Sequence, residues 1–177
     1  MTVPETACRR RERAALDLVP TGYDDEVVRA LDEEVQQVYV ERYGGRDETP
    51  MSVEQFASPS GHFVVGYLDG RPVTMGGWRL RADAAGTSLP GRRPAEIKRM
   101  FVREDARGRG LGRRVLAELE RSAAAAGVDW LVLETGDRQP EAVALYRSAG
   151  YVDVDAFGVY ADEDGSIYLG KPLRPEV

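Results

Sequence analysis

The sequence predicts a mixed α/β fold that occupies residues 1–177 as a single domain, and three observations support this prediction. A chain of 177 residues that is 42% hydrophobic can bury one substantial core. Segments with strand-like apolar patterns are interspersed with segments whose apolar residues recur at three- and four-residue steps, as in helices. One strand–helix–strand crossover joins residues 96–102 to residues 130–135. The predicted order of elements is β-α-α-β-β-β-α-β-α-β-β.

The N-terminal part of the chain predicts a short strand followed by a long helix. Residues 1–12 lack periodic apolar positions and are expected to be frayed, whereas "RAALDLVP" after them has the pattern of a strand. Apolar residues at helical spacing predict a helix over residues 23–43. Asp24 or Asp25 is expected to cap this helix, and Gly44 follows its end.

A short second helix and a hairpin are predicted next. "SVEQFAS" has the spacing of a capping box and therefore predicts a short helix. "HFVVGYLDGRPVTMGGWRL" predicts two strands joined by a tight turn at Asp69-Gly70. Gly76 and Gly77 inside the second strand indicate a bulge or a close approach of another backbone.

The C-terminal half alternates strands with helices. After a polar loop at residues 82–95, "EIKRMFV" predicts a strand and "GLGRRVLAELERSAAAAG" predicts a helix that ends at Gly127. "DWLVLET" is apolar almost throughout, which is typical of a strand buried on both faces. "QPEAVALYRSAG" predicts another helix, and "YVDVDAF" and "SIYLGKPL" predict two final strands.

Composition excludes several classes of function. The formal net charge is −6 and the isoelectric point is near 5.0, which argues against a general nucleic-acid binder. No apolar run approaches the ~20 residues that span a bilayer, and no secretory signal is readable, so we expect no membrane partner and a cytoplasmic location. One histidine, His62, and one distant cysteine, Cys8, make no metal site, so no metal is expected.

The chain concentrates basic residues in one segment despite its acidic total. Residues 98–114 hold seven lysines and arginines against Glu104 and Asp105, a local balance of +5. A strand, a glycine-rich turn and a helix N-terminus follow one another here, and unpaired N–H groups at a helix N-terminus attract anions. Glycines at 108, 110 and 112 let a bulky phosphate approach the backbone. The sequence therefore predicts a phosphate or pyrophosphate site.

Two common phosphate-binding motifs fit poorly. A P-loop needs a Lys-Ser or Lys-Thr pair after its last glycine, and none follows here. A dinucleotide fingerprint would use Gly108 and Gly110, but Arg113 stands where its third glycine belongs. A nucleotide-dependent oxidoreductase is therefore a weaker alternative, which the absence of repeated β-α-β units also disfavours.

The pattern Arg107-x-x-Gly110-x-Gly112 resembles the pyrophosphate-binding signature R/Q-x-x-G-x-G/A of the GCN5-related N-acetyltransferase (GNAT) family. A second stretch, "LVLETGDRQPEAVALYRSAGY", resembles that family's fifth strand and fourth helix, with the pattern N-x-x-A-x-x-L-Y-x-x-x-G-F/Y. The resemblance extends over residues 60–173 in element order. It implies a mixed, mostly antiparallel sheet of six to seven strands, flanked by about four helices, with a splay between the strands at 96–102 and 130–135.

The resemblance also implies acetyl-CoA as co-substrate. The backbone of one strand would pair with the pantetheine arm, and the N–H groups from Gly108 to Arg113 would hold the pyrophosphate. Gln139 stands where the family often has an asparagine that contacts the pantetheine, although it could instead cap the following helix. The expected cofactor-binding residues are Met100, Phe101, Val102, Arg107, Gly108, Arg109, Gly110, Leu111, Gly112, Arg113 and Gln139.

Two catalytic residues are carried over from the family. Tyr146 matches the usual general acid, since a phenol with a pKa near 10 is protonated at neutral pH and can donate to the leaving thiolate; the alternative is a core tyrosine. Glu96 matches the general base of histone-acetylating members, but could instead pair with a nearby arginine. Glu134, at the end of the neighbouring strand, is the second candidate base.

The resemblance predicts an N-acetyltransferase that transfers acetyl from acetyl-CoA to a primary amine of a small molecule or peptide by direct attack. Trp78, Glu134 and Tyr160 are candidate substrate contacts, with core packing as the alternative for both Trp78 and Tyr160. An acyl-CoA-binding sensor without catalysis is the alternative function. Dimers are common among similar proteins, and the sequence leaves open the oligomeric state, the identity of the acceptor and the use of other acyl groups.

Overall fold

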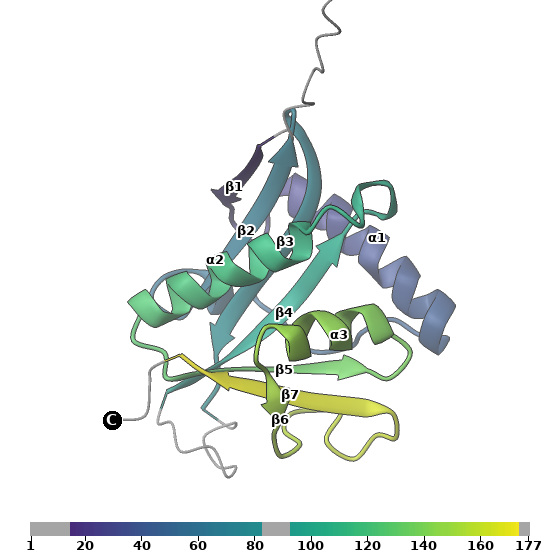
Figure 1. Ribbon diagram of the computed structural model, residues 1–177, viewed down its shortest axis with the longest axis vertical. Coiled ribbons are helices and arrows are strands. Elements are labelled where there is room, and N and C mark those ends of the chain that lie inside the picture. Colours follow the sequence, from purple (N-terminus) through teal and green to yellow (C-terminus); the bar gives the residue numbers. More distant parts are fainter. Residues whose placement is uncertain (1–14, 83–92, 174–177) are drawn as a thin grey trace, which may run out of the picture.

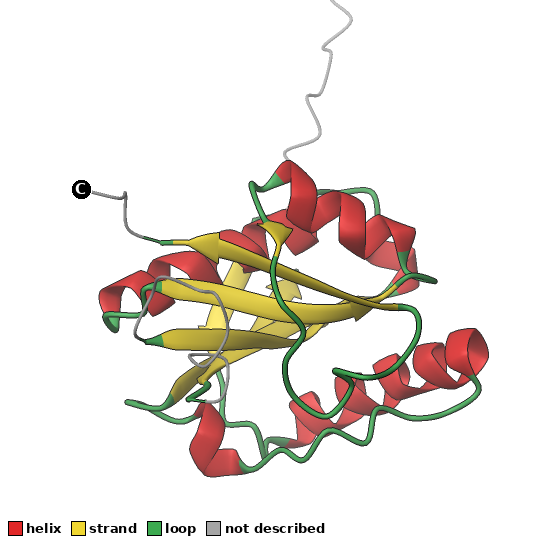
Figure 2. Cartoon of the chain, turned by 90° about the horizontal axis from the view of Figure 1, so that it is seen from below, coloured by secondary structure: helices red, strands yellow, loops and turns green. Residues whose placement is uncertain are grey.

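The computed structural model describes residues 15–82 and 93–173, and these form a seven-stranded sheet with helices on both faces (Figures 1 and 2). The strand order is β1-β2-β3-β4-β5-β7-β6. All neighbours are antiparallel except β4 and β5, which are parallel. The mixed, mostly antiparallel sheet predicted from the sequence is confirmed. Cys8 and the frayed segment expected at residues 1–12 lie outside the described residues.

The first part of the chain follows the predicted order. Strand β1 (Leu16–Pro20) precedes helix α1 (Glu26–Tyr43), and the Asp25 carboxylate caps α1 by accepting the Val27 N–H at 2.8 Å. Gly44 ends the helix in the left-handed region with φ 81°, a conformation that costs glycine nothing.

The short second helix is a single 3₁₀ turn, η1 (Val53–Phe56), rather than an α-helix. The Gln55 side chain accepts the Ser52 N–H at 3.0 Å, so the predicted capping contact is present. Strands β2 (Gly61–Leu68) and β3 (Arg71–Leu80) form the hairpin, and Asp69 and Gly70 both have positive φ, as the predicted tight turn requires.

The second half contains the crossover. Strand β4 (Pro94–Val102) leads through a 3₁₀ turn, η3 (Glu104–Ala106), into α2 (Leu111–Ala125), and β5 (Trp130–Gly136) returns beside β4. Helix α3 (Pro140–Ser148) follows, and β7 (Ser166–Pro172) closes the described chain. The strand expected over 151–157 was predicted too long, because β6 contains only Val152 and Asp153.

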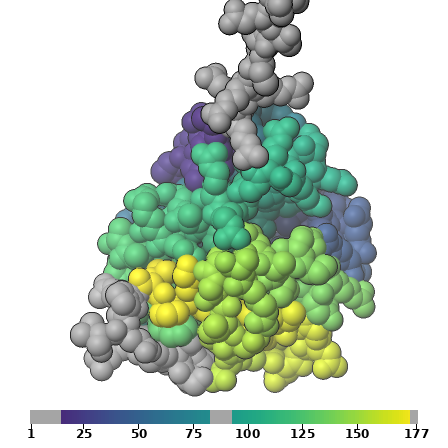
Figure 3. Space-filling model, viewed as in Figure 1, coloured from purple at the N-terminus to yellow at the C-terminus, as the bar shows by residue number. Residues whose placement is uncertain are grey.

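Three α-helices cover the sheet. Helices α2 and α3 lie on the face seen in Figure 1, where their atoms cover much of the surface (Figure 3), and α1 lies behind the sheet. One buried cluster includes Val115, Leu116 and Leu119 of α2 with Leu131 and Leu133 of β5. A second cluster packs α1 on the opposite face, through Val28, Leu31, Val35, Phe63, Val65, Met75 and Phe101. Burying both faces fixes β4 and β5 at the centre of the molecule.

Candidate active site

The sheet opens between β4 and β5. The two strands pair only over Pro94–Glu96 of β4 and Trp130–Val132 of β5, and their C-terminal halves then diverge (Figure 1). The splay expected from the sequence is therefore confirmed. Beyond it, the edge of β4 that faces β5 has no strand partner within residues 15–82 and 93–173, so its backbone groups are available to an added extended chain.

A bulge in β4 lies beside this opening. Met75 pairs with Phe101 and Gly77 pairs with Lys98, so one residue of β3, Gly76, faces two residues of β4. Arg99 takes up the extra residue with φ 58°, an unusual conformation for a side chain of its size. The extra residue of the bulge lies on β4, opposite the predicted strand, whereas the predicted close approach of a backbone is present at Gly77, where a Cβ would lie 2.7 Å from the His62 carbonyl oxygen.

The opening leads into a cavity of about 710 Å³. It is lined by the end of α1 and the loop after it, by Ile97 to Met100 of β4, by the end of β5, by α3 and by the loop before β7. Five of the expected site residues lie on its wall: Met100, Glu134, Gln139, Tyr146 and Tyr160. The lining segments run from Tyr39 to Ser166, 127 residues apart in the sequence, and meet only in the folded chain.

The Gly/Arg loop (residues 107–113) adjoins the C-terminal end of β4. Gly108 and Gly110 have φ of 75° and 76°, and no atom lies within 4 Å of where a Cβ would stand on either residue. The Arg114 N–H donates to the Gly110 carbonyl at 3.3 Å. Among the described residues, the N–H groups from Gly108 to Arg113 have no acceptor, so the loop offers a row of free donors at the N-terminus of α2.

The basic residues around this loop divide into two groups. Arg107, Arg109 and Arg113 are exposed on the loop. Arg103 instead binds Glu34 of α1, and Lys98 and Arg99 are buried in ion pairs on the opposite side of β4. The local charge of +5 therefore does not all face one anion, because the bulge at Arg99 places the adjacent Lys98 and Arg99 on the same side of β4, where both pair with Asp47.

A family model matches the part of the chain that contains most of this site. Residues 32–151 match the model of the acetyltransferase (GNAT) family, and this match spans the opened sheet, the Gly/Arg loop and α3. The chain belongs to the GNAT family. The resemblance noted in the sequence is confirmed, and the protein is an acetyl-CoA-dependent acyltransferase.

Individual relatives agree with the family. The chain is 35% identical to an "IAA acetyltransferase" of Azospirillum brasilense over 149 residues, which are 84% of this chain and 92% of the relative. It is also similar to a Klebsiella pneumoniae protein assigned as an acyl-CoA N-acyltransferase, with a TM-score of 0.73, 25% identity and coverage of 92% and 100% of the two chains. An aminoglycoside 6′-N-acetyltransferase solved with coenzyme A shares the fold at a TM-score of 0.65 and 18% identity, covering 91% and 99%.

Tyr146 of this GNAT protein is nearly enclosed. Its side chain is 6% exposed, it packs edge-to-face on Tyr151 with ring centroids 5.6 Å apart, and burial raises its pKa. No hydrogen bond ties its hydroxyl to another described residue, although the residue lines the cavity. The group is therefore a protonated phenol with a free donor facing the cavity.

Glu134 is the carboxylate best suited to accept a proton. It lies on β5, lines the cavity and accepts one hydrogen bond, from the Ser166 hydroxyl at 3.0 Å. Burial raises the pKa of Glu134, while the nearby ammonium of Lys98 opposes this shift. A buried carboxylate with a raised pKa and no ion pair among the described residues is suited to accept a proton.

Glu96 has a different environment. It is 3% exposed and lies outside the lining of the cavity. Arg79 donates to its Oε2 through Nε at 3.1 Å and Nη2 at 3.0 Å, and Arg81 donates at 2.5 Å. Lys98 lies 3.6 Å from its other oxygen. With three cations around it, this carboxylate matches the alternative weighed in the sequence, a partner for arginine.

The structure also separates the remaining candidates. Trp78 is 2% exposed in the core, donates to the Ser122 hydroxyl at 2.9 Å and does not reach the cavity. Gln139 is the residue before α3, but its side chain forms no capping hydrogen bond. Of the β4 residues, Met100 lines the cavity, Phe101 packs against the cluster under α1, and the Val102 carbonyl accepts from Arg107 Nε at 3.1 Å.

Several residues of the cavity had no signal in the sequence. Asp47, in the loop after α1, accepts from the Tyr160 hydroxyl at 2.8 Å and pairs with Arg99 and Lys98. Burial would raise the pKa of Asp47, but the two cations hold it well below its usual range. Tyr39 of α1 also lines the cavity, and burial raises its pKa. "GGRDETP" carries no motif, so only the long-range contacts with Tyr160, Arg99 and Lys98 identify Asp47.

Two searches of the described residues gave negative results. No group of three or more His, Cys, Asp or Glu side chains within residues 15–82 and 93–173 is arranged to hold a metal ion. None of the helices in the same ranges is long and apolar enough to cross a membrane.

Proposed function

We propose that this protein transfers the acetyl group of acetyl-CoA to a primary amine, with the transfer taking place in the cavity between β4 and β5. The observation that carries the proposal is that one cavity is lined by a free phenol, Tyr146, and by an unpaired carboxylate, Glu134, and adjoins the opened edge of β4. The proposed acid, base and thioester site thus meet at one cavity.

The coenzyme is proposed to bind along β4 and across the Gly/Arg loop. The free N–H groups from Gly108 to Arg113 and the exposed Arg107, Arg109 and Arg113 suit a pyrophosphate. The unpaired edge of β4 at Met100 suits the amide groups of the pantetheine arm, with Phe101 and Val102 holding the strand in place. The Gln139 side chain does not cap α3; it contacts Tyr43 on the cavity wall, from where it is proposed to reach the same arm.

The reaction assigns a role to each of the two titratable groups. An amine arrives as an ammonium, and Glu134 accepts one proton and passes it to solvent. The free amine attacks the thioester carbonyl carbon, forming the C–N bond, and the C–S bond then breaks. Tyr146 donates its proton to the departing thiolate and is reprotonated by the second proton that leaves the nitrogen. The products are the amide, free coenzyme A and one proton.

Glu134 is preferred to Glu96 as base because of what surrounds each carboxylate. The two arginines on Glu96 would have to give up buried hydrogen bonds before it could take a proton. Glu134 has one neutral donor and faces the cavity. Tyr160 is proposed to contact the acceptor, whereas Trp78 is not.

Tyr146→Phe tests the proposal. We expect kcat, measured by release of free thiol from acetyl-CoA with an amine, to fall by about 10²–10⁴-fold while acetyl-CoA affinity is unchanged. Tyr151→Phe is the matched control, because it removes a buried hydroxyl from the adjoining ring outside the cavity lining. Equal turnover in the two variants would make Tyr146 a packing residue.

A further inference from the structure

The part of the sheet that contains β4 is joined to β5 and α3 in different ways on its two faces. The strands β4 and β5 pair only over Pro94–Glu96 and Trp130–Val132. On one face, the buried apolar cluster under α2 includes residues of both strands. On the other face, the buried apolar cluster under α1 includes residues of β2, β3 and β4 but, in the described ranges 15–82 and 93–173, none of β5, α3 or β7. On the α1 face, other contacts must therefore fix the C-terminal end of β5.

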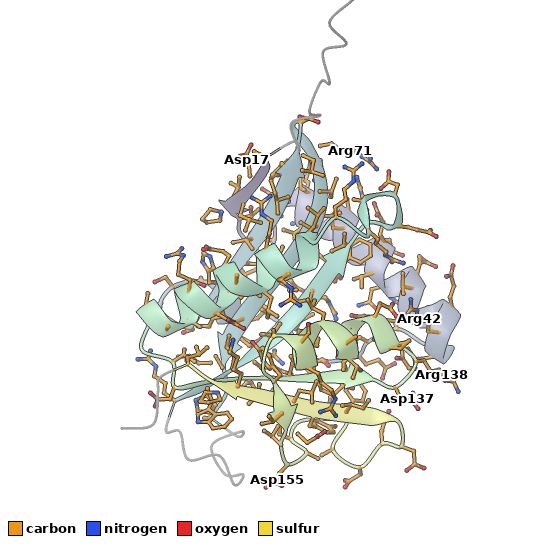
Figure 4. The ribbon with its side chains drawn as sticks, viewed as in Figure 1. Asp17, Arg42, Arg71, Asp137, Arg138 and Asp155 are labelled. Atoms are coloured by element: carbon orange, nitrogen blue, oxygen red, sulfur yellow. The ribbon has the colours of Figure 1, made fainter. Side chains whose placement is uncertain are left out.

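Polar contacts at the end of α1 reach the turn between β5 and α3. Arg42, in the last turn of α1, donates through Nη1 to the Arg138 carbonyl at 3.0 Å, and Arg138 donates through its own Nη1 to the Arg42 carbonyl at 2.8 Å. Arg42 Nη1 also lies 2.6 Å from Oε1 of Glu141, in the first turn of α3. Figure 4 shows Arg42 and Arg138 close to each other at this end of the molecule. Arg42, Arg138 and Glu141 are called the α1 clasp below.

The α1 clasp uses backbone groups that helix geometry leaves free. The last carbonyls of a helix have no donor within the helix, and the Arg42 carbonyl is one of them because α1 ends at Tyr43. The Arg42 guanidinium also suits the C-terminus of α1, where the helix dipole favours a cation. Arg138 directly precedes Gln139, the N-cap of α3. The two reciprocal bonds therefore connect the end of α1 to the beginning of α3 and limit both their separation and their relative orientation.

The same turn, residues 136–139, packs closely against α1. A Cβ on Gly136 would lie 2.1 Å from the Tyr43 hydroxyl oxygen, so only glycine permits this approach. On its other side, the turn is tied to the loop before β7, because the Asp137 N–H donates to the Gly165 carbonyl at 2.8 Å. The turn is thus held between α1 and that loop.

This turn connects the two groups proposed to move protons. Glu134 lies on β5, two residues before Gly136, and Tyr146 lies on α3, which begins directly after the turn. The groups proposed to bind the coenzyme lie on the other part of the sheet, along β4 and the Gly/Arg loop. A displacement of the turn therefore moves Glu134 and Tyr146 relative to the thioester.

We propose that Arg42 is a positioning residue: through the α1 clasp it holds the β5–α3 turn, so that Glu134 and Tyr146 stay aligned with the edge of β4 that binds the coenzyme. This inference rests on the proposed function. Arg42 acts through the turn, because it is not among the residues that line the cavity. The side chains of Arg42 and Glu141 are 25% and 56% exposed, and an ion pair of this kind contributes little to stability. Its loss should therefore reduce catalysis without unfolding the protein.

Arg42→Met tests the inference in the thiol-release assay, with whichever of hexylamine, benzylamine, glycinamide and ethylenediamine the wild type acetylates fastest. We expect kcat to fall by about tenfold, because a displacement of about 1 Å of aligned groups can cost up to about 10²-fold. Acetyl-CoA affinity, measured by calorimetry, should change by less than about threefold, because the Gly/Arg loop is not part of the α1 clasp. The midpoint of thermal unfolding should change by less than about 3 °C.

The matched control is Arg71→Met. Arg71 forms an exposed ion pair with Asp105 at 2.7 Å, and Figure 4 shows it at the top of the molecule, away from Arg42. This variant should keep the kcat of the wild type.

Two further variants separate positioning from a general loss of structure. Arg42→Lys keeps a cationic donor and should recover most of kcat. Arg138→Met removes only one of the two reciprocal bonds and should lower kcat less than Arg42→Met does. If kcat falls only as far as the unfolding midpoint falls, or if lysine at position 42 restores nothing, Arg42 is not a positioning residue.

Hydrogen–deuterium exchange provides a measurement that does not depend on activity. The amides of residues 136–148 should exchange at least about fivefold faster in Arg42→Met than in the wild type, because the turn and α3 lose their attachment to α1. The amides of α2, Leu111–Ala125, should exchange at the wild-type rate and serve as the internal control.

The outcomes separate this inference from the proposed function. Wild-type kcat in Arg42→Met, or unchanged exchange at residues 136–148, overturns the positioning role and leaves amine acetylation in place. Faster exchange in Arg42→Met, with no thiol release by the wild type from any amine, supports the α1 clasp as the contact that holds the turn and overturns the proposed function. If neither thiol release nor faster exchange is observed, both fail.

Discussion

The two sides of the cavity are built from different parts of the chain. On one side, Ile97 to Met100 of β4 line the cavity, and the same continuous segment runs on into the adjoining Gly/Arg loop, whose free donors are backbone N–H groups. On the other side, α1, the loop after it, the end of β5 and the loop before β7 each contribute two or three side chains. Asp47 and Tyr160, joined by a 2.8 Å hydrogen bond, are 113 residues apart.

The difference shows which binding sites a sequence can reveal. A backbone site needs glycines at fixed spacing because only glycine reaches positive φ without strain, so it leaves a pattern of adjacent letters. A side-chain site needs only that certain side chains lie close together in the folded protein. Any of several segments can provide these side chains, so the site leaves no fixed spacing in the sequence.

The largest effect is expected at Glu96, a buried residue of β4 that lies outside the cavity lining. Glu96→Gln leaves Arg79 and Arg81 buried beside a neutral amide, and breaking a buried ion pair in this way costs about 3–5 kcal/mol. We expect a matching fall in the free energy of unfolding, measured with urea. Glu33→Gln, which breaks an exposed pair with Arg46, is the control and should change stability far less.

The same variant tests the choice of base. If the folded Glu96→Gln protein keeps the fall in kcat/KM at low pH that the wild type shows, Glu96 is structural. If Glu96→Gln loses that fall and Glu134→Gln keeps it, the two roles are reversed and the proposed mechanism is wrong.

The proposed binding of the coenzyme at the Gly/Arg loop is tested by introducing one carboxylate. Gly110→Asp places a negative charge where a pyrophosphate is proposed to bind and should weaken acetyl-CoA binding by at least about 100-fold, measured by calorimetry. Gly70→Asp is a close control, because Gly70 has the same φ of 76° and equally open surroundings, but lies in the β2–β3 turn. Equal affinity in the two variants would remove the loop from the binding site.

The smallest effect is expected from Lys98 of β4, through its influence on the pKa of Glu134 on β5. Burial raises the pKa of Glu134, Lys98 lowers it, and Asp47 and Glu96 raise it further. Lys98→Met therefore raises the pKa of Glu134. Because a base acts only when it is deprotonated, activity should then appear at higher pH.

The expected change is a displacement of the low-pH limb of kcat/KM to higher pH by up to about one unit. Lys171→Met, which removes a half-buried lysine paired with Glu120 outside the cavity lining, should leave the profile unchanged. A shift to lower pH in Lys98→Met would contradict the assignment of Glu134.

Much of the fold could be predicted from the sequence, because it depends on the conformational preferences of neighbouring residues. The helix cap, expected at Asp24 or Asp25 and found at Asp25, and the turn at Asp69-Gly70 each depend on the conformational range of one or two residues, and the sequence predicted both. The order of strands and helices followed from apolar periodicity. The predictions that were wrong, an α-helix at "SVEQFAS" and a long strand at 151–157, concerned short segments whose conformation is set by packing.

The sequence by itself determined the family and the Gly/Arg loop, because adjacent residues are enough to specify free backbone donors. Only the tertiary structure decided that Glu96 lies under two arginines, that Glu134 faces the cavity, and that Lys98 and Arg99 turn away from the loop. A carboxylate or ammonium takes its behaviour from its burial and from the charges around it. Those surroundings come from segments up to about a hundred residues away, so they exist only after the chain has folded.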